Sequence, residues 1–196
     1  MPGAAERTVR IAAFGDSLTA GYQLASQDAF PVQLERALKA KGVAVEIANA
    51  GVSGDTSTGG LARLDWSVPD GTDAVILELG ANDMLRAVDP KVTRDALAEI
   101  VRRLKARGIE VLLCGMLAPR NLGPDYTRAF DSIYPDLATA NGLLLYPFFL
   151  DGIAADAKLN QSDGLHPTAA GVAKIVTGIM PKAEELVARV RAKSPN

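Results

Sequence analysis

Short apolar segments alternate with longer amphipathic segments along almost the whole chain. Five apolar segments have the length of strands, namely 9–14, 43–48, 73–79, 109–114 and 143–146. Between them, apolar residues recur at helical spacing, as at Phe30, Leu34, Ala37 and Leu38. Strands that alternate with helices form βαβ units, in which helices cover both faces of a parallel sheet. The pattern therefore predicts an α/β fold.

Glycine, proline and aspartate mark the expected helix ends. Gly42 is expected to close the helix that contains Phe30. Asp89 and Pro90 are expected to begin another helix, with Asp89 as its cap, and Gly108 is expected to end it.

Two prolines lie inside predicted helical segments. Pro135 is expected to kink or split the segment 125–140, because proline lacks the N–H that an interior position needs. Pro181 is a candidate break in the last helical stretch, which begins after Pro167 and carries a long apolar face.

Length and composition indicate one ordinary globular domain. The 196 residues are 48% hydrophobic and 22% charged, with a formal net charge of -2. We expect a single domain over 1–196 with its core at about 9–190. The charge does not favour a nucleic-acid partner, and no segment approaches the ~20 apolar residues of a membrane span. Residues 1–10 lack an apolar signal core. The sequence therefore leaves two locations open: periplasmic or secreted if an upstream signal was removed, and otherwise cytoplasmic.

Polar residues gather where the predicted strands end. The segments 15–18, 49–55 and 80–83 follow the first three strands, and 163–167 precedes the last helix. Ligands of open α/β sheets bind beyond the carboxyl ends of the strands. We therefore expect these four loops to converge on one site.

The four loops contain the groups that acyl transfer needs. Ser17 is a hydroxyl nucleophile on a turn where Gly15 would permit unusual backbone angles. His166 is the only histidine and suits a base near neutral pH, and Asp163, three residues earlier, can reach its Nδ1 through a local turn. The predicted catalytic residues are therefore Ser17, Asp163 and His166.

Donors for an oxyanion are present in the same loops. The backbone N–H groups of Ser17 and Gly54 and the side-chain amide of Asn82 are the candidates. Each of these residues also has a simpler interpretation. A lone histidine can be structural, and the turn at Ser17 can be a helix cap or an anion-binding turn. Asp163 can cap the last helix, Gly54 can serve only the backbone geometry, and Asn82 can belong to an ordinary turn. Their joint position at one sheet edge favours the catalytic interpretation.

Other chemistries fit the sequence less well. Cys114 lies in an apolar strand and is expected to be buried and inert. A single histidine and a single cysteine make no metal-ligand cluster, and neither a Walker lysine nor Gly-x-Gly-x-x-Gly is present. Gly-x-Ser-x-Gly is also absent. We therefore expect no cofactor and no metal.

The same residues resemble a known family. Gly15-Asp16-Ser17-Leu18, Gly54, Asn82 and Asp163-Gly164-Leu165-His166-Pro167 resemble the four blocks of the SGNH (GDSL) hydrolases. The likeness is strongest to the bacterial thioesterase I/lysophospholipase group and its arylesterase relatives. It extends through Ser53–Thr56, Gly59–Leu64, Ala129–Pro135 and Pro147–Phe149, and so covers about Val9 to Met180.

The resemblance implies a fold and a set of roles. The fold would be a three-layer αβα sandwich with a flavodoxin-like, five-stranded parallel sheet of order 2-1-3-4-5. The roles of nucleophile, acid and base would fall on Ser17, Asp163 and His166. Residues 84–89 would match a mobile loop, and 116–124 would line an acyl groove. Candidate groove residues are Met84, Leu85, Met116, Leu117, Pro119 and Leu122.

The expected function is hydrolysis of aryl and short- to medium-chain acyl esters, with thioesters and lysophospholipids as further substrates of the family. The expected partner is a small acyl ester, and the chain would act as a monomer or small homo-oligomer. An acyltransferase that uses the same triad is an alternative. A non-catalytic flavodoxin-like binding module is a second one, but it leaves Asn82 and the Asp163–His166 pair without a role.

Overall fold

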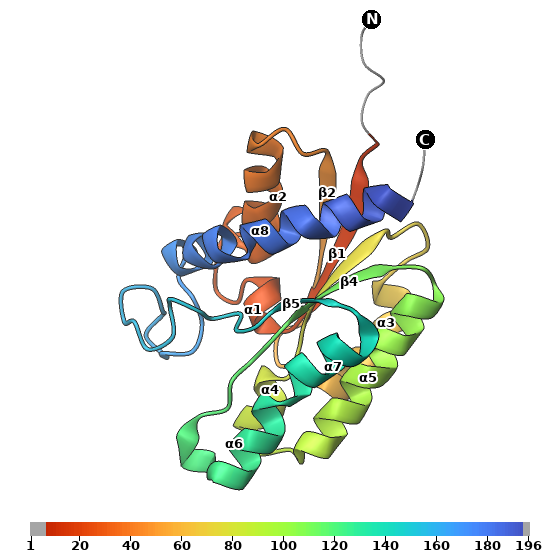
Figure 1. Cartoon of the computed structure of the whole chain (residues 1–196). Helices are drawn as coiled ribbons and strands as arrows, with labels where there is room; N and C mark the ends of the chain where they lie inside the picture. Colours follow the sequence, from red (N-terminus) through yellow and green to blue (C-terminus); the bar gives the residue numbers. More distant parts are fainter. Residues whose placement is uncertain (1–6, 194–196) are drawn as a thin grey trace, which may run out of the picture.

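Five parallel strands form the centre of the structure, a computed structural model that describes residues 7–193. Their order in the sheet is β2-β1-β3-β4-β5, which confirms the predicted order (Figure 1). The strands are β1 (Val9–Gly15), β2 (Val45–Gly51), β3 (Ala74–Glu78), β4 (Glu110–Cys114) and β5 (Leu144–Tyr146). β3 occupies the middle of the sheet, and all five of its residues are buried, Glu78 included.

Helices cover both faces of this sheet. They are α1 (Ser17–Ala20), α2 (Phe30–Ala40), α3 (Ser57–Ser67), α4 (Ala81–Leu85), α5 (Pro90–Ala106), α6 (Pro124–Asp131), α7 (Ile133–Asn141) and α8 (Ala169–Lys193), with short 3-10 helices at Ser26–Asp28 and Arg120–Leu122. α2 and α8 pack together on one face, and α3, α5 and α7 lie on the other (Figure 1). The predicted three-layer αβα sandwich is therefore confirmed.

The helix ends follow the predicted signals. Asp89 caps α5 by accepting the Lys91 N–H at 2.8 Å, and Pro90 is its first residue. Gly42 and Gly108 follow the ends of α2 and α5 with φ of +81° and +74°, in the left-handed region that glycine adopts without strain.

Two expectations about elements need correction. β2 begins and ends later than the predicted 43–48, because it pairs with β1 along its full length, from Val45 opposite Val9 to Gly51 opposite Gly15. Pro181 does not break α8, which continues through it to Lys193. The apolar face of α8 packs on the sheet without interruption, and this burial offsets the missing N–H.

Proline also explains the split between α6 and α7. The two helices separate at Ser132, three residues before Pro135. Pro135 thereby falls in the first turn of α7, where a backbone N–H has no partner within the helix. The predicted split is confirmed.

Candidate active site

Ser17 begins α1, separated from the end of β1 by one residue, and lies at the carboxyl edge of the sheet. Asp16 caps this short helix, since its Oδ1 accepts the Leu18 N–H at 3.0 Å. Gly15 was expected to permit unusual backbone angles. This expectation was wrong, because Gly15 has no positive φ. A Cβ at Gly15 would instead lie 2.2 Å from Thr19 Oγ1 and 2.6 Å from the Glu78 carbonyl oxygen. Glycine is therefore needed because the neighbouring groups approach so closely.

The structure brings Ser17, His166 and Asp163 together in one chain of contacts. The Nε2 of His166 lies 2.9 Å from Ser17 Oγ, and its Nδ1 lies 2.6 Å from Asp163 Oδ2. Ser17 is 9% exposed, and the side chain of His166 is 20% exposed. This geometry permits proton transfer from the hydroxyl to the imidazole.

A tight turn holds Asp163 against His166. Asp163 Oδ1 accepts the backbone N–H groups of His166 at 3.0 Å and Leu165 at 2.9 Å. These two bonds, followed by the bond from the His166 side chain, lower the pKa of Asp163 to about 2. Asp163 is therefore ionised at neutral pH and can accept the Nδ1 proton, which leaves Nε2 free to act as a base.

Two backbone N–H groups in the loops of the candidate site have no partner within the described protein. Within residues 7–193, neither the Ser17 N–H nor the Gly54 N–H donates a hydrogen bond to another group of the protein. Gly54 has a φ of +82°, a conformation that strains any residue with a side chain. Free donors of this kind can bind an anionic oxygen.

The side chain of Asn82 joins the loops that follow the first three strands. Its Nδ2 lies 2.9 Å from the carbonyl oxygen of Asp55 and 3.2 Å from Oδ2 of Asp16. Asn82 is thus held beside both the Ser17 turn and the loop of Gly54. The second of these contacts is long and can yield to a substrate oxygen.

Two residues that support these loops were missed from the sequence. Asp83 is buried and accepts hydrogen bonds from the Ser57 N–H at 2.8 Å, the Ser57 hydroxyl at 2.5 Å and the Thr93 hydroxyl at 3.0 Å. Asp83 therefore ties α3 and α5 to the turn that carries Asn82. In the sequence, Asp83 stood out only as the last residue of the segment 80–83.

Arg63 is the second missed residue. Its guanidinium donates to the carbonyl oxygens of Gly15 at 2.8 Å and Ala50 at 2.9 Å, and its Nε lies 2.6 Å from Asp55 Oδ2. The group also lies 4.3 Å from the centre of the Phe14 ring. Arg63 thereby joins the ends of β1 and β2 to the loop that contains Gly54. Arginine is almost always exposed in proteins, so an arginine in a short Gly-rich segment is not expected to be buried. The sequence therefore gave no indication of this role.

The candidate groove residues differ in their exposure. Leu85 is 52% and Leu117 39% exposed, and Pro119 is also exposed. Met84 and Leu122 are half-buried, whereas Met116 is only 2% exposed and belongs to the core. The structure therefore leaves Met116 little surface for a ligand.

Two further exposed apolar side chains, which the sequence interpretation did not include, lie on the loops that carry Gly54 and His166. Val52 lies two residues before Gly54 and is 43% exposed, and Leu165 directly precedes His166 and is 50% exposed. Both residues are therefore close in sequence to a residue of the candidate site.

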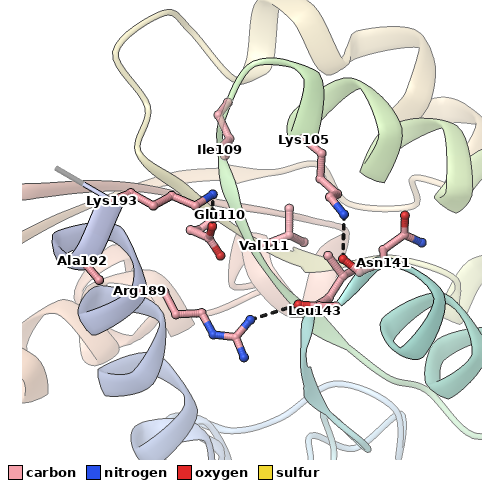
Figure 2. A pocket seen from close by; sticks show the side chains of 10 residues that line it. Lys105, Ile109, Glu110, Val111, Asn141, Leu143, Arg189, Ala192 and Lys193 are labelled. Atoms are coloured by element: carbon pink, nitrogen blue, oxygen red, sulfur yellow. Dashed lines mark hydrogen bonds and ion pairs between the residues drawn. The ribbon is translucent and has the colours of Figure 1, made fainter.

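A cavity of about 360 Å³ lies at the opposite edge of the sheet, where β4 and β5 begin (Figure 2). Lys105 and Arg189 enter it but donate to the carbonyl oxygens of Asn141 at 2.6 Å and Gly142 at 3.0 Å. These cations neutralise carbonyls at the end of α7. The cavity lies at the amino ends of the strands, away from Ser17, and these two cations are engaged with helix-end carbonyls.

Residues 7–193 contain no helix long and apolar enough to cross a membrane, and no group of three metal-ligating side chains. Cys114 is buried as predicted, and burial raises the pKa of its thiol.

Comparisons with known proteins identify relatives of this chain. The GDSL-like Lipase/Acylhydrolase family matches residues 13–174. An arylesterase of Vibrio mimicus is 38% identical over 85% of this chain and 84% of its own length. Thioesterase 1/protease 1/lysophospholipase L1 of Escherichia coli is 39% identical over 78% of this chain and 73% of its own.

Solved structures agree with these relatives. The crystal structure of AlinE4, an SGNH-hydrolase family esterase, is 43% identical and superposes with a TM-score of 0.78, covering 93% of this chain and 98% of that one. The chain belongs to the GDSL-like lipase/acylhydrolase family and is a carboxylic ester hydrolase with the SGNH-hydrolase fold.

Proposed function

We propose that this chain hydrolyses aryl and short- to medium-chain acyl esters through Ser17, His166 and Asp163, by way of an acyl-enzyme. The observation that carries the proposal is the continuous contact from Ser17 Oγ through the His166 ring to the Asp163 carboxylate, at 2.9 and 2.6 Å.

In the first half of the reaction, His166 Nε2 takes the proton of Ser17 as Oγ attacks the ester carbonyl carbon. The imidazolium that forms is stabilised by Asp163, whose charge persists because its pKa is lowered to about 2. The imidazolium then gives this proton to the leaving alcohol or phenol, and the C–O bond breaks. The acyl group remains on Ser17 Oγ.

In the second half, water attacks the acyl carbon while Nε2 accepts one of its protons. Collapse of the second tetrahedral intermediate returns that proton to Ser17 Oγ and releases the carboxylic acid. The N–H groups of Ser17 and Gly54 and the Asn82 amide would hold the oxyanion in both halves. Their use is favoured because the two backbone donors have no partner within the described protein.

The surroundings of the site favour an uncharged, apolar substrate. The exposed side chains of Val52, Leu85 and Leu165 lie on the segments that carry Gly54, Asn82 and His166. Arg86 donates to the Gly54 carbonyl oxygen at 2.9 Å, and Arg120 pairs with Asp131 at 3.0 Å, so neither forms part of a dense basic patch for the phosphates of coenzyme A. Small esters are therefore preferred over long acyl-CoA thioesters.

The decisive test is the variant Ser17→Ala with an aryl butyrate. We expect kcat to fall by a factor of roughly 10⁴ or more, because no other group can form the acyl-enzyme. A fluorophosphonate should label the wild-type protein on the peptide that contains Ser17 and leave the variant unlabelled. Undiminished turnover by a folded variant would exclude the mechanism.

Substrate class is tested separately. Rates across an acyl-length series, measured on phenyl esters and on coenzyme A thioesters, should decline with chain length and favour the phenyl esters. A strong preference for palmitoyl-CoA would contradict the proposed substrate class without affecting the triad.

A further inference from the structure

A pair of buried carboxyl groups lies beside the nucleophile turn. Asp16 directly precedes Ser17, and Glu78 is the last residue of β3, paired in register with Gly15. Asp16 is 0% and Glu78 1% exposed. The Asp16 N–H lies 3.4 Å from Glu78 Oε2, so the two carboxyl groups adjoin in one buried space, where two negative charges would repel each other.

The other groups that contact Glu78 include no cation that could balance a negative charge on its carboxyl group. Its Oε2 accepts the Thr19 hydroxyl at 2.8 Å and, more distantly, the Asp16 N–H at 3.4 Å. Its Oε1 is buried and receives no hydrogen bond. None of the ion pairs found within residues 7–193 includes Glu78 or Asp16. An ionised Glu78 would therefore be uncompensated in the core.

Asp16 is the better site for the negative charge. Its Oδ1 accepts the Leu18 N–H at 3.0 Å at the start of α1, and its Oδ2 lies 3.2 Å from Asn82 Nδ2. Hydrogen bonds to a carboxylate favour its ionised form, and Asp16 receives two from groups other than Glu78.

We propose that Glu78 is a positioning residue that stays a neutral carboxylic acid at neutral pH and donates its proton to the carboxylate of Asp16. The pair then carries one negative charge. The protonation state of Glu78 is a property of the protein without substrate and does not depend on the proposed function. Only the expected effect of Glu78 on kcat rests on the proposed function.

The electrostatics agree with this geometry. Burial raises the pKa of Asp16 to about 6 and raises that of Glu78 well above its usual value, and the charge of Asp16 raises that of Glu78 further. Among the groups on neighbouring elements, His166 lowers the pKa of Asp16 by its charge. Burial raises the pKa values of Tyr134 and Cys114, so neither supplies a charge to the pair. Asp83 and Arg63 bind other partners, namely Ser57 and Asp55.

The arrangement affects the reaction through Asn82. Asp16, held by the proton of Glu78, keeps the Asn82 amide beside the Ser17 turn. A second negative charge at this place would repel the oxyanion and would bind the amide proton more tightly, in competition with the substrate. We therefore expect the neutral form of Glu78 to act on kcat rather than on KM.

The protonation can be tested without turnover. The infrared spectrum of the full-length Ser17→Ala protein at pH 7 should contain the carbonyl stretch of a protonated carboxylic acid. Labelling only glutamate with ¹³C should shift this band, and labelling only aspartate should not. Absence of the band, or a shift on aspartate labelling alone, would overturn the assignment. Because Ser17→Ala is inactive under the proposed mechanism, this result is independent of the proposed function.

Two substitutions of Glu78 test the catalytic consequence. Glu78→Gln keeps a neutral donor of the same shape, so kcat should remain within about 3-fold of wild type and the acid limb of the kcat/KM profile should not move. Glu78→Leu removes the donor, and kcat should fall about 10-fold or more with little change in KM. Equal losses in both variants, or an acid limb that moves to lower pH in Glu78→Gln, would show that wild-type Glu78 is ionised and contradict the proposal.

Discussion

The ring of Tyr22 lies against the imidazole of His166, with the ring centres 4.5 Å apart and the planes inclined by 39°. Tyr22 follows α1 on the segment that begins with Ser17, whereas His166 lies far along the chain. Gln161 connects the two segments, since its Nε2 donates to the Tyr22 carbonyl oxygen at 2.9 Å and its N–H donates to the His166 carbonyl oxygen at 2.7 Å. Tyr22 therefore contacts the face of the imidazole, while Ser17 and Asp163 contact its two nitrogens at the edge.

Tyr22→Ala is expected to lower kcat by about 2- to 12-fold, because an aromatic pair contributes ~0.5 to 1.5 kcal/mol. A positive charge that forms on the imidazole would gain further from the tyrosine face. Tyr22→Phe keeps the ring and should retain near wild-type kcat. Steady-state kinetics on an aryl butyrate checks both, and equal losses would show that the hydroxyl rather than the ring is responsible.

Asp163→Asn is expected to lower kcat by a factor of about 10⁴, because an amide favours the wrong imidazole tautomer. Asp125→Asn, on an exposed aspartate of α6, serves as a matched control without effect.

The same variant, Asp163→Asn, should also change the pH dependence of stability. The pKa of Asp163 is lowered to about 2, so its carboxylate stabilises the fold at pH values above the usual pKa of 3.8. This contribution is lost as the pH falls toward 2. The stability difference between variant and wild type should therefore shrink in acid, as measured by urea unfolding.

Asn82→Ala is expected to lower kcat about 10²- to 10³-fold with little change in KM, as the loss of an oxyanion donor does. Asn141→Ala, at the end of α7 and remote from the site, should leave kcat unchanged. A rise in KM at constant kcat would indicate that Asn82 binds the ground state instead.

Arg63→Met is expected to destabilise the fold by about 3 to 5 kcal/mol, because it leaves the carboxylate of Asp55, which is only 13% exposed, without its partner. Arg63→Lys retains the charge but cannot reach Gly15, Ala50 and Asp55 together, so an intermediate loss is expected. Urea unfolding at pH 7 measures both. A loss below about 1 kcal/mol in Arg63→Met would show that the ion pair contributes little.

Gly15→Ala is expected to destabilise the protein by about 3 kcal/mol or more, since the added methyl group would overlap Thr19 and the Glu78 backbone. Gly108→Ala is the control, because its Cβ would meet nothing within 4 Å and only the φ of +74° opposes it. That strain costs roughly 1 to 2 kcal/mol. Similar losses in the two variants would indicate that close packing at Gly15 is unimportant.

Local sequence signals predicted most elements correctly. The five strands, the cap of α5 at Asp89 and the split near Pro135 depend on residues close together in the chain. α3 was missed, because Gly59 and Gly60 are typical of loops. Within the fold these glycines are required by contact, since a Cβ would lie 2.0 Å from Asp55 Oδ1 at Gly59 and 2.4 Å from Leu79 Cδ1 at Gly60.

The sequence by itself determined the alternation of strands and helices and, through the rule for parallel sheets, which loops meet. It also placed Asp163 beside His166, because three residues of one turn suffice for that contact. Only the tertiary structure decided that Arg63 joins two strand ends, that Glu78 adjoins Asp16 and that Tyr22 covers His166. Except for the bond from Arg63 to Ala50, 13 positions away, these contacts join residues 48 or more positions apart. Periodicity along a chain carries no information about which distant side chains will share one buried space.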